Sequence, residues 1–342
     1  MCKQVIDTRT EMIYVVRAPQ YVGRPEKTIA DLLLEQWDEA GVTFIEIGDR
    51  VPKKIVKGVF YDHEESLNHY IETFNTLKRR IKDGDTILLI EGWNASVPFY
   101  RQYIDTLDLE VGLFGIFHSS VYVPGEFFSD LAWAKTFEHY LYSALDKILV
   151  ATDYMREHLA TNNARVTGLP LPNDVKTGTT FAERENIIAF SHRWDKDKRP
   201  EVFLRLAEIL KDTAEFWLLT PKEVAVDNKH IKVVVNKTRE EYLHNLSKAK
   251  IIFSSAELET FGYSVIEGVM SGCRPLLPHA ACYTEQYVDE YLYKNENEMV
   301  EKATNLLRAY SEKDPMKMLR KYEDAPMRVL EEITDENFPI RG

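Results

Sequence analysis

The sequence predicts an α/β protein of two Rossmann-like domains that face each other across a cleft. A chain of 342 residues is too long for one ordinary domain and suits two, each of roughly 170 residues. Short apolar runs alternate with longer helical patterns, and this alternation starts again after residue 186. Strands that alternate with helices are typical of a parallel sheet covered on both faces. Ligands bind at the carboxyl ends of such strands, so we expect the active site in the cleft.

The first half of the chain contains short β-branched runs, which predict buried strands, and amphipathic stretches, which predict helices. In the first such stretch, Ile29, Leu33 and Trp37 fall on one helical face. The expected strands are Met12–Arg17, Thr43–Ile47, Thr86–Ile90, Val111–His118 and Lys147–Val150. The expected helices are Thr28–Ala40, His63–Lys82 and Leu131–Leu145.

The second half repeats this pattern after Gly168–Thr180, a stretch rich in Gly, Pro, Thr and Asn that predicts an interdomain linker. We therefore predict one domain over residues 1–170 and a second over 171–314. A last helix, Pro315–Glu332, lies in a segment (315–342) that is expected to cross back to the first domain. The expected strands are Ile187–Phe190, Glu215–Leu219, Ile231–Val235, Ile251–Ser254 and Pro275–Leu277. The expected helices are Pro200–Lys211, Arg239–Lys248 and Tyr263–Ser271.

The composition excludes several classes of protein. Hydrophobic residues make up 44% of the chain and charged residues 29%, which is enough to bury two cores. Cys2, Cys273 and Cys282 are an odd and scattered set, which argues against a disulfide framework or a zinc site and fits a reducing compartment. The chain contains no apolar run of the ~18–20 residues that span a bilayer. It has no signal-peptide pattern at its start. We expect a cytoplasmic protein without a membrane partner, as a monomer or homodimer.

The net charge limits nucleic-acid binding. Lys and Arg number 43 against 55 for Asp and Glu, which gives −12. This excess of acid argues against a protein whose whole surface attracts polyanions, but it leaves room for a local basic groove.

The stretch SSAELETFGYSVIEGVMSGC, residues 254–273, is the sharpest feature of the sequence. It leaves a predicted strand, and Gly262 then permits a tight entry into a helix that starts near Tyr263. The N–H groups and dipole at such a helix terminus suit a diphosphate. Glu259 before the helix and Glu267 in about its first turn could accept hydrogen bonds from sugar hydroxyls on either side of that phosphate. The alternative is a glutamate that stabilises the helix dipole and a second one that is solvated.

The loop SHRWDKDKRPEVFL, residues 191–204, follows the first strand of the second domain. Arg193 and Lys198 lie where that strand's carboxyl end opens into the cleft. Two fixed cations there could neutralise a diphosphate as it departs. The alternative is a solvated loop of mixed charge.

A histidine and two short acidic strings complete the candidates. His118 follows a strand of the first domain, so it is either a site residue or a packed, capping histidine. The strings Asp83-Gly-Asp85 and Asp195-Lys-Asp197 match the D-x-D pattern of metal sites. The first predicts a turn before a strand and the second is embedded in the Arg/Lys loop, so we expect no metal.

These stretches resemble retaining GT-B glycosyltransferases of the glycosyl-transferase group 1 type. Glu259-Thr-Phe-Gly-Tyr-Ser-Val-Ile-Glu267 looks like their E-x7-E motif, and Arg193 and Lys198 match their Arg/Lys phosphate pair. The nearest branch is the tRNA-queuosine mannosyltransferase-like one, because HRWDKDKRPEVF resembles its HRW-x-x-DK-x-P-E-x-F stretch. GCRPLLPHAACYTEQYVDEYLY is similar to its GC-x-P-L-x-P…Y-x-E…EYLY stretch, and FHSSVYVPGEF to its FHENQ-x-x-YP. Where that branch has Gly-Gly-Ser-His, this chain keeps one glycine, Gly23.

The resemblance implies a retaining hexosyl- or pentosyltransferase that uses a UDP- or GDP-sugar as substrate and needs no cofactor and no metal. The first domain would bind the acceptor and the second the nucleotide sugar. Arg193 and Lys198 would hold the diphosphate, Glu267 the ribose and Glu259 the transferred sugar, with His118 near the far hydroxyls of that sugar. The further implied donor contacts are Gly23, Phe261, Gly262, Tyr263 and Ser264.

The acceptor is the least defined part of the prediction. Basic residues beside aromatic ones suit an unpaired base, so the best interpretation is a hydroxyl on a modified nucleobase in DNA or tRNA. The alternative is that the basic residues lie at a helix C-terminus, where they complement its dipole, and that the aromatic residues belong to the core. Other interpretations are a small-molecule, lipid or glycan acceptor, and a sugar-nucleotide epimerase or non-catalytic binding protein. The residues concerned are Lys53, Lys54, Lys57, Lys78, Arg79, Arg80, Lys82, Trp93, Tyr100, Tyr122, Phe127 and Phe128.

Overall fold

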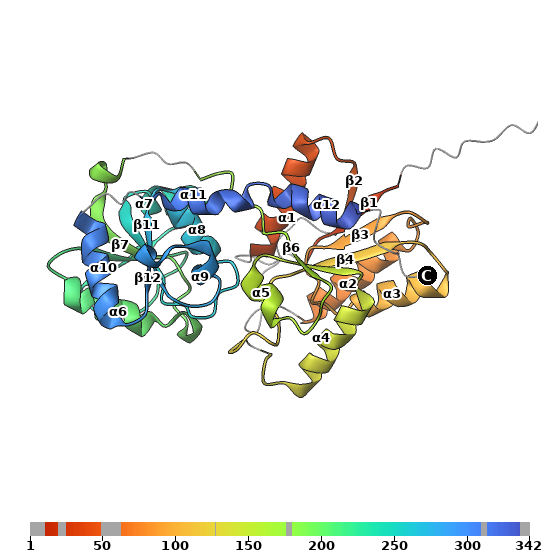
Figure 1. Cartoon of the computed structure of the whole chain (residues 1–342), viewed down its shortest axis with the longest axis horizontal. Helices are drawn as coiled ribbons and strands as arrows, with labels where there is room; N and C mark the ends of the chain where they lie inside the picture. The colour runs from red at the N-terminus through yellow and green to blue at the C-terminus, as the bar shows by residue number, and fades with distance from the viewer. Residues whose placement is uncertain are drawn as a thin grey trace, which may run out of the picture. The chain divides into compact units, whose positions relative to one another are not determined.

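The computed structural model describes residues 11–19, 25–48, 63–126, 128–175, 180–308 and 313–335. These residues form two compact units (Figure 1). Unit 1 comprises the described residues up to Ala151, those from Arg156 to Pro170 and those from Asp324 onward. Unit 2 comprises Thr152–Met155 and Leu171–Glu323. Each unit is built on a six-stranded parallel sheet.

The sheet of unit 1 has the strand order β2-β1-β3-β4-β5-β6. Ile13 at the start of the first strand pairs with Phe44 on one side and Thr86 on the other. Most strand positions are buried without alternation, as expected when helices cover both faces. The strands are β1 (Ile13–Val16), β2 (Phe44–Ile47), β3 (Thr86–Leu89), β4 (Gly112–Phe117), β5 (Lys147–Val150) and β6 (Ala164–Val166).

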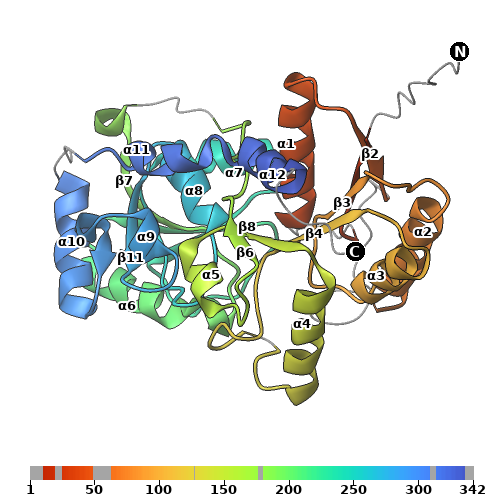
Figure 2. The same ribbon diagram turned by 45° about the vertical axis from the view of Figure 1, so that its right-hand side comes forward.

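Connections between parallel strands of one sheet are almost always right-handed. The chain steps from β1 to β2 in one direction and from β3 through β6 in the other, so α1 lies on one face and α3 and α4 on the opposite face. Figures 1 and 2 show α12 beside α1, and α3 beside α4, which the contacts confirm. The helices are α1 (Pro25–Glu39), α2 (His63–Leu77), α3 (Val97–Thr106), α4 (Ala132–Ala144) and α12 (Ala325–Thr334), and α5 (Asp153–His158) is divided between the two units.

The end of the described chain packs on unit 1. Trp37 Nε1 donates to the carbonyl oxygen of Pro326 over 2.8 Å, and the buried Lys147 Nζ contacts Glu332 Oε2 at 3.0 Å. The predicted continuous helix Pro315–Glu332 is interrupted, because a 3₁₀ turn at Arg320–Tyr322 separates α11 from α12. Pro326 lacks an N–H group and therefore starts a helix more readily than it continues one.

The sheet of unit 2 has the strand order β12-β11-β10-β7-β8-β9. The strands β7 and β10 are neighbours, so the loops that follow them leave the same edge of the sheet. The strands are β7 (Glu185–Phe190), β8 (Glu215–Thr220), β9 (Ile231–Val235), β10 (Ala249–Phe253), β11 (Arg274–Pro278) and β12 (Leu292–Tyr293). The helices are α6 (Pro200–Leu210), α7 (Arg239–Leu246), α8 (Tyr263–Met270), α9 (Tyr283–Gln286), α10 (Glu296–Arg308) and α11 (Pro315–Leu319).

Within the described part of the chain, none of the helices combines the length and the apolar character that crossing a bilayer requires.

Candidate functional site

The predicted donor residues of unit 2 gather at the carboxyl ends of β7 and β10. The loop after β7 carries Arg193 and Lys198, and the loop after β10 carries Glu259. Ser255, just after β10, joins the two loops, because its hydroxyl donates to the carbonyl oxygen of Lys198 over 2.7 Å. Arg199, the next residue, adopts a left-handed conformation (φ 50°) and is the N-cap of α6. The two loops are therefore hydrogen-bonded to each other at this edge of the sheet.

Lys198 and Glu259 form an ion pair at this edge. Lys198 Nζ lies 3.0 Å from Glu259 Oε2, and the two side chains are 14% and 18% exposed. Burial alone would lower the pKa of Lys198, but the carboxylates of Glu259 and Asp197 outweigh it and raise this pKa above its usual value. The lysine is thus a largely desolvated cation, which is where a fixed charge acts most strongly on a phosphate.

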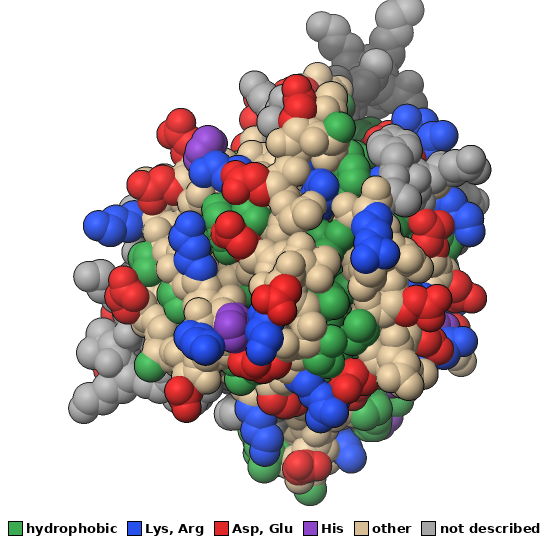
Figure 3. All heavy atoms as spheres, turned by 90° about the vertical axis from the view of Figure 1, so that its left-hand side faces the viewer, with side chains coloured by type: hydrophobic (Ala, Val, Ile, Leu, Met, Phe, Trp, Pro, Cys, Tyr) green, Lys and Arg blue, Asp and Glu red, His purple; other side chains and the backbone are tan. Residues whose placement is uncertain are grey.

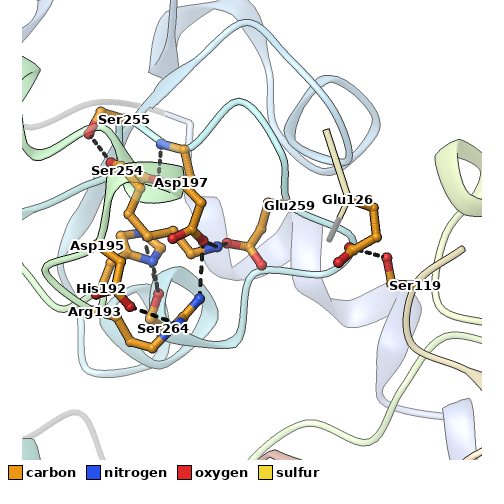
Figure 4. Close-up of polar contacts among 12 residues, drawn as sticks. Ser119, Glu126, His192, Arg193, Asp195, Asp197, Ser254, Ser255, Glu259 and Ser264 are labelled. Atoms are coloured by element: carbon orange, nitrogen blue, oxygen red, sulfur yellow. Dashed lines mark hydrogen bonds and ion pairs between the residues drawn. The ribbon is translucent and has the colours of Figure 1, made fainter. Parts of the chain in front are cut away.

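Arg193 lies beside the second acidic string. Its guanidinium contacts Asp195 at 2.8 Å and Asp197 at 3.1 Å, and its side chain is half exposed (Figure 4). A diphosphate that binds Arg193 would have to compete with these two carboxylates. Among the residues that the structure describes, no group of three or more His, Cys, Asp or Glu side chains is placed to hold a metal ion.

Gly262 sets the position of the α8 N-terminus. Its φ of +78° lies in the left-handed region, and a Cβ there would come within 3.0 Å of the Tyr283 ring. The first N–H groups of an α-helix have no partners within the helix. Phe261, Tyr263 and Ser264, three further predicted donor contacts, lie at this turn, and a Cβ on Gly262 would lie 3.4 Å from Glu259 Cγ. The arrangement suits an anionic ligand.

His192 is a residue of this edge that the sequence analysis did not select. It is buried, and Ser264 Oγ lies 3.1 Å from its Nδ1 (Figure 4). Burial, together with the charges of Lys198 and Arg193, lowers the pKa of His192 to about 3, so the imidazole is neutral at physiological pH. The sequence offered one signal for this residue, because His192 stands beside Arg193 and two residues after the end of β7.

Glu267 is the fifth residue of α8, which begins at Tyr263 as predicted. It is partly exposed and accepts hydrogen bonds from Arg239 and Tyr242 of α7, which the sequence analysis did not single out. Burial raises the pKa of Glu267, and the guanidinium of Arg239 opposes that shift.

Unit 1 carries the remaining predicted residues. His118 directly follows β4, and its Nε2 lies 2.7 Å from the carbonyl oxygen of Ile90. The loop after β4 is held by Glu138 of α4, which is fully buried and accepts hydrogen bonds from Trp93 Nε1 and the Val121 N–H, both at 2.9 Å. Gly23, Phe127, Lys53, Lys54 and Lys57 lie outside the described residues.

The aromatic candidates of unit 1 separate into two groups. Trp93 and Phe128 stack with their ring centroids 5.3 Å apart, after β3 and β4 respectively. Tyr100 belongs to the core instead, because it is 1% exposed and its hydroxyl donates to Thr73. The sequence analysis missed Trp133 and Tyr140, which protrude from α4 and are 56% and 48% exposed.

The basic cluster Lys78–Lys82 follows the C-terminus of α2 and precedes β3. It lies toward the amino end of β3, whereas Trp93 follows the carboxyl end. Arg79 Nε donates to the carbonyl oxygen of Asn75 in the last turn of α2, as a helix-capping cation does.

On the face drawn in Figure 3, acidic and basic side chains are interspersed.

Curated proteins and solved structures both include proteins similar to this chain. No protein-family model matches the chain. The tRNA-queuosine alpha-mannosyltransferase of Drosophila melanogaster is 28% identical over 134 residues, which are 35% of this chain and 36% of the relative. The chain thus matches about a third of that relative's length.

The similar structures cover nearly the whole chain at low sequence identity. HepE of Anabaena, in complex with UDP and glucose, has a TM-score of 0.64 at 9% identity and covers 96% of this chain and 100% of its own. Sucrose-phosphate synthase of Thermosynechococcus elongatus has a TM-score of 0.61 at 14% identity and covers 96% of both chains. The lipopolysaccharide galactosyltransferase WaaB has 0.59 at 10% identity and covers 96% of this chain and 97% of its own. The expected resemblance is confirmed, and the chain has the two-domain GT-B fold of glycosyltransferases.

Proposed function

We propose that the protein is a retaining glycosyltransferase that moves a sugar from a UDP- or GDP-sugar to a hydroxyl group on a modified nucleobase in DNA or tRNA. The observation that carries the proposal is the largely buried Lys198–Glu259 pair, 14% and 18% exposed, beside the N-terminus of α8. A cation and a helix N-terminus suit a diphosphate, and a carboxylate beside them suits sugar hydroxyls. The UDP and glucose bound to HepE, which shares the fold, fit a donor of this class.

The transfer would proceed by attack on the same face from which the nucleotide leaves. The bond from the anomeric carbon to the diphosphate oxygen breaks, and the acceptor oxygen bonds to that carbon. The acceptor's proton passes to the departing phosphate oxygen, so the protein need not supply a base. Lys198, Arg193 and the α8 N–H groups stabilise the negative charge that develops, while Glu259 positions the sugar. We assign His118 to hydroxyls of the sugar on the strength of the family resemblance alone.

Two observations favour a nucleobase acceptor. The curated relative is named for its action on a modified nucleoside of tRNA. In unit 1, the acceptor-side domain of this proposal, Trp133 protrudes beside the stacked Trp93 and Phe128 rings. Exposed aromatic rings are the surfaces on which unpaired bases stack. Tyr140, seven residues after Trp133 and so on the same face of α4, is also exposed and extends this aromatic surface.

Mass spectrometry of nucleosides tests this acceptor. The protein is incubated with UDP- and GDP-sugars and, in separate reactions, tRNA, hydroxymethylated DNA, a glycan pool or lipid vesicles. The proposal predicts a nucleoside heavier by one sugar residue, joined in the donor's anomeric configuration as read by NMR. Transfer to glycan or lipid alone would contradict the nucleobase acceptor. An inverted linkage would contradict the retaining mechanism, and an altered free nucleotide sugar would indicate an epimerase.

Activity is expected to survive EDTA. Lys198, Arg193 and the α8 N-terminus can supply the positive charge that a metal ion provides in other transferases. The initial rate of transfer is measured before and after dialysis against EDTA. A complete loss of rate that Mn²⁺ restores would overturn the metal-independent mechanism.

Replacing Glu267 by Ala should weaken the binding of the nucleoside diphosphate by roughly tenfold to a hundredfold. The change removes hydrogen bonds from ribose hydroxyls to a carboxylate, and bonds to charged groups contribute about 1.5–3 kcal/mol each. Calorimetric titration of UDP and GDP measures the effect. Glu301→Ala, an exposed glutamate on α10, is the control and should bind as the unaltered protein does. Equal affinities of the two variants would refute the ribose role.

A further inference from the structure

We propose that Arg239 and Tyr242 are positioning residues that hold the Glu267 carboxylate oriented for the nucleotide's ribose, and that Asp174 fixes Arg239. This inference rests on the proposed function, in which Glu267 binds that ribose. It adds a second layer of residues, drawn from α7 and from the segment before β7, to the donor site.

Arg239 bridges two carboxylates. Its Nε and Nη2 donate to the two oxygens of Asp174 over 2.8 and 2.9 Å, a two-point contact that fixes the plane of the guanidinium. Its Nη1 donates to Glu267 Oε1 over 2.5 Å. Because Asp174 occupies one edge of the guanidinium, the remaining nitrogen is aimed at Glu267. Arg239 is also the first residue of α7, whose start is capped by the Thr238 side chain.

Tyr242 supplies the second contact to Glu267. Its hydroxyl donates to Glu267 Oε2 over 3.0 Å. Burial, and then the charge of Glu267, raise the pKa of Tyr242 well above its usual value, so the phenol keeps its proton and acts as the donor. Arg239 and Tyr242 are three residues apart on α7, and the same turn of that helix therefore reaches both oxygens of Glu267.

Each oxygen of Glu267 keeps capacity for a ligand. An ionised carboxylate accepts about four hydrogen bonds. Arg239 takes one at Oε1 and Tyr242 one at Oε2. About one acceptor position remains on each oxygen, which matches a ribose that offers two neighbouring hydroxyls. The two contacts therefore fix the Glu267 carboxylate and leave each of its oxygens able to accept a hydrogen bond from a ligand.

The ionisation of Glu267 depends on Arg239. Burial raises the pKa of Glu267 most, and the charge of Asp174 adds to that shift. Arg239 and the Tyr242 hydroxyl lower the pKa, while Tyr263, one turn earlier on α8, faces the same carboxylate as a neutral phenol. Arg239 is the cation among the four groups that act on this carboxylate. Its removal should therefore raise the pKa of Glu267 further toward neutrality.

The test measures UDP and GDP affinity of the full chain across pH. Arg239→Met should weaken binding by about tenfold or more near neutral pH. Only the ionised carboxylate accepts both ribose hydroxyls, so a higher pKa moves the loss of affinity to higher pH. Between about pH 8 and pH 5, the affinity of R239M should fall more steeply than that of the unaltered protein, since both share the titration of the nucleotide's terminal phosphate (pKa about 6). Arg239→Lys should restore the profile of the unaltered protein in part, and Asp174→Asn should give a smaller loss.

Arg205→Met, which removes an exposed arginine paired with Glu296 on the same unit, is the matched control. A parallel thermal melt shows that each variant is folded. If the unaltered protein binds neither nucleotide, the proposed function fails. If it binds, but R239M has the affinity and pH profile of R205M, the positioning role fails while the proposed function stands. A uniform loss in R239M with an unchanged pH profile would also overturn the inference.

Discussion

Replacing Lys198 by Met is expected to lower the kcat of sugar transfer by roughly 10²–10³, the usual cost of removing one fixed group that stabilises developing charge. The substitution keeps most of the apolar stem of the side chain and removes its charge. Lys198 is 14% exposed and lies 3.0 Å from Glu259, so solvent screens its charge less than at an exposed position. The variant also frees Glu259, whose negative charge would then oppose the departing phosphate.

Two further variants make this expectation specific. Lys196→Met removes an exposed lysine from the same 3₁₀ turn and should leave kcat near that of the unaltered protein. Lys198→Arg keeps the charge and should retain part of the activity. Initial rates with saturating nucleotide sugar give kcat. A K198M protein that is folded and turns over as fast as K196M would remove Lys198 from the mechanism.

Replacing Gly268 by Ala is expected to destabilise unit 2 by about 1–3 kcal/mol. Alanine stabilises a helix interior by about 1 kcal/mol relative to glycine, which offsets part of this loss. The steric clash is the larger effect, because a Cβ at residue 268 would lie 2.6 Å from Cβ of Ile252 on β10. Real side chains do not approach so closely, so α8 would have to move away from the sheet and carry Glu267 with it.

Denaturant unfolding of the single and double variants checks this account. The cost of Gly268→Ala should shrink in an Ile252→Ala background, since a smaller side chain lets α8 and β10 readjust. The two changes should therefore be less than additive. A Gly268→Ala protein as stable as the unaltered one, or more stable, would show that α8 tolerates a side chain there.

Much of the fold could be predicted from the sequence, because buried parallel strands are short, apolar and β-branched. All ten predicted strands are present, with ends that differ by up to two residues. The strands β6 and β12 were missed because they have only three and two residues. The helix α3 was missed because Pro98 resembles a helix breaker, although it stands at the start of the helix, where proline is tolerated.

The candidate site was predictable where it depends on local sequence. The strand end, Gly262 and the helix after it lie within about twenty residues, so their spacing alone indicates an anion site. The Lys198–Glu259 contact needs the adjacency of β7 and β10, which only the sheet order provides. Arg239 lies 65 positions after Asp174 and 28 before Glu267 along the chain. No local spacing relates these three residues, and their contacts arise only from the tertiary structure of unit 2.

The most direct test of the central claim is the release of UDP or GDP from nucleotide sugars. The purified protein is incubated with a pool of UDP- and GDP-sugars, with and without tRNA or hydroxymethylated DNA, and the free nucleotide is quantified over time. The account predicts release that nucleic acid stimulates and that Lys198→Met slows by roughly 10²–10³ while Lys196→Met does not. No release with any donor or acceptor, or release that is equal in the K198M and K196M proteins, would contradict it.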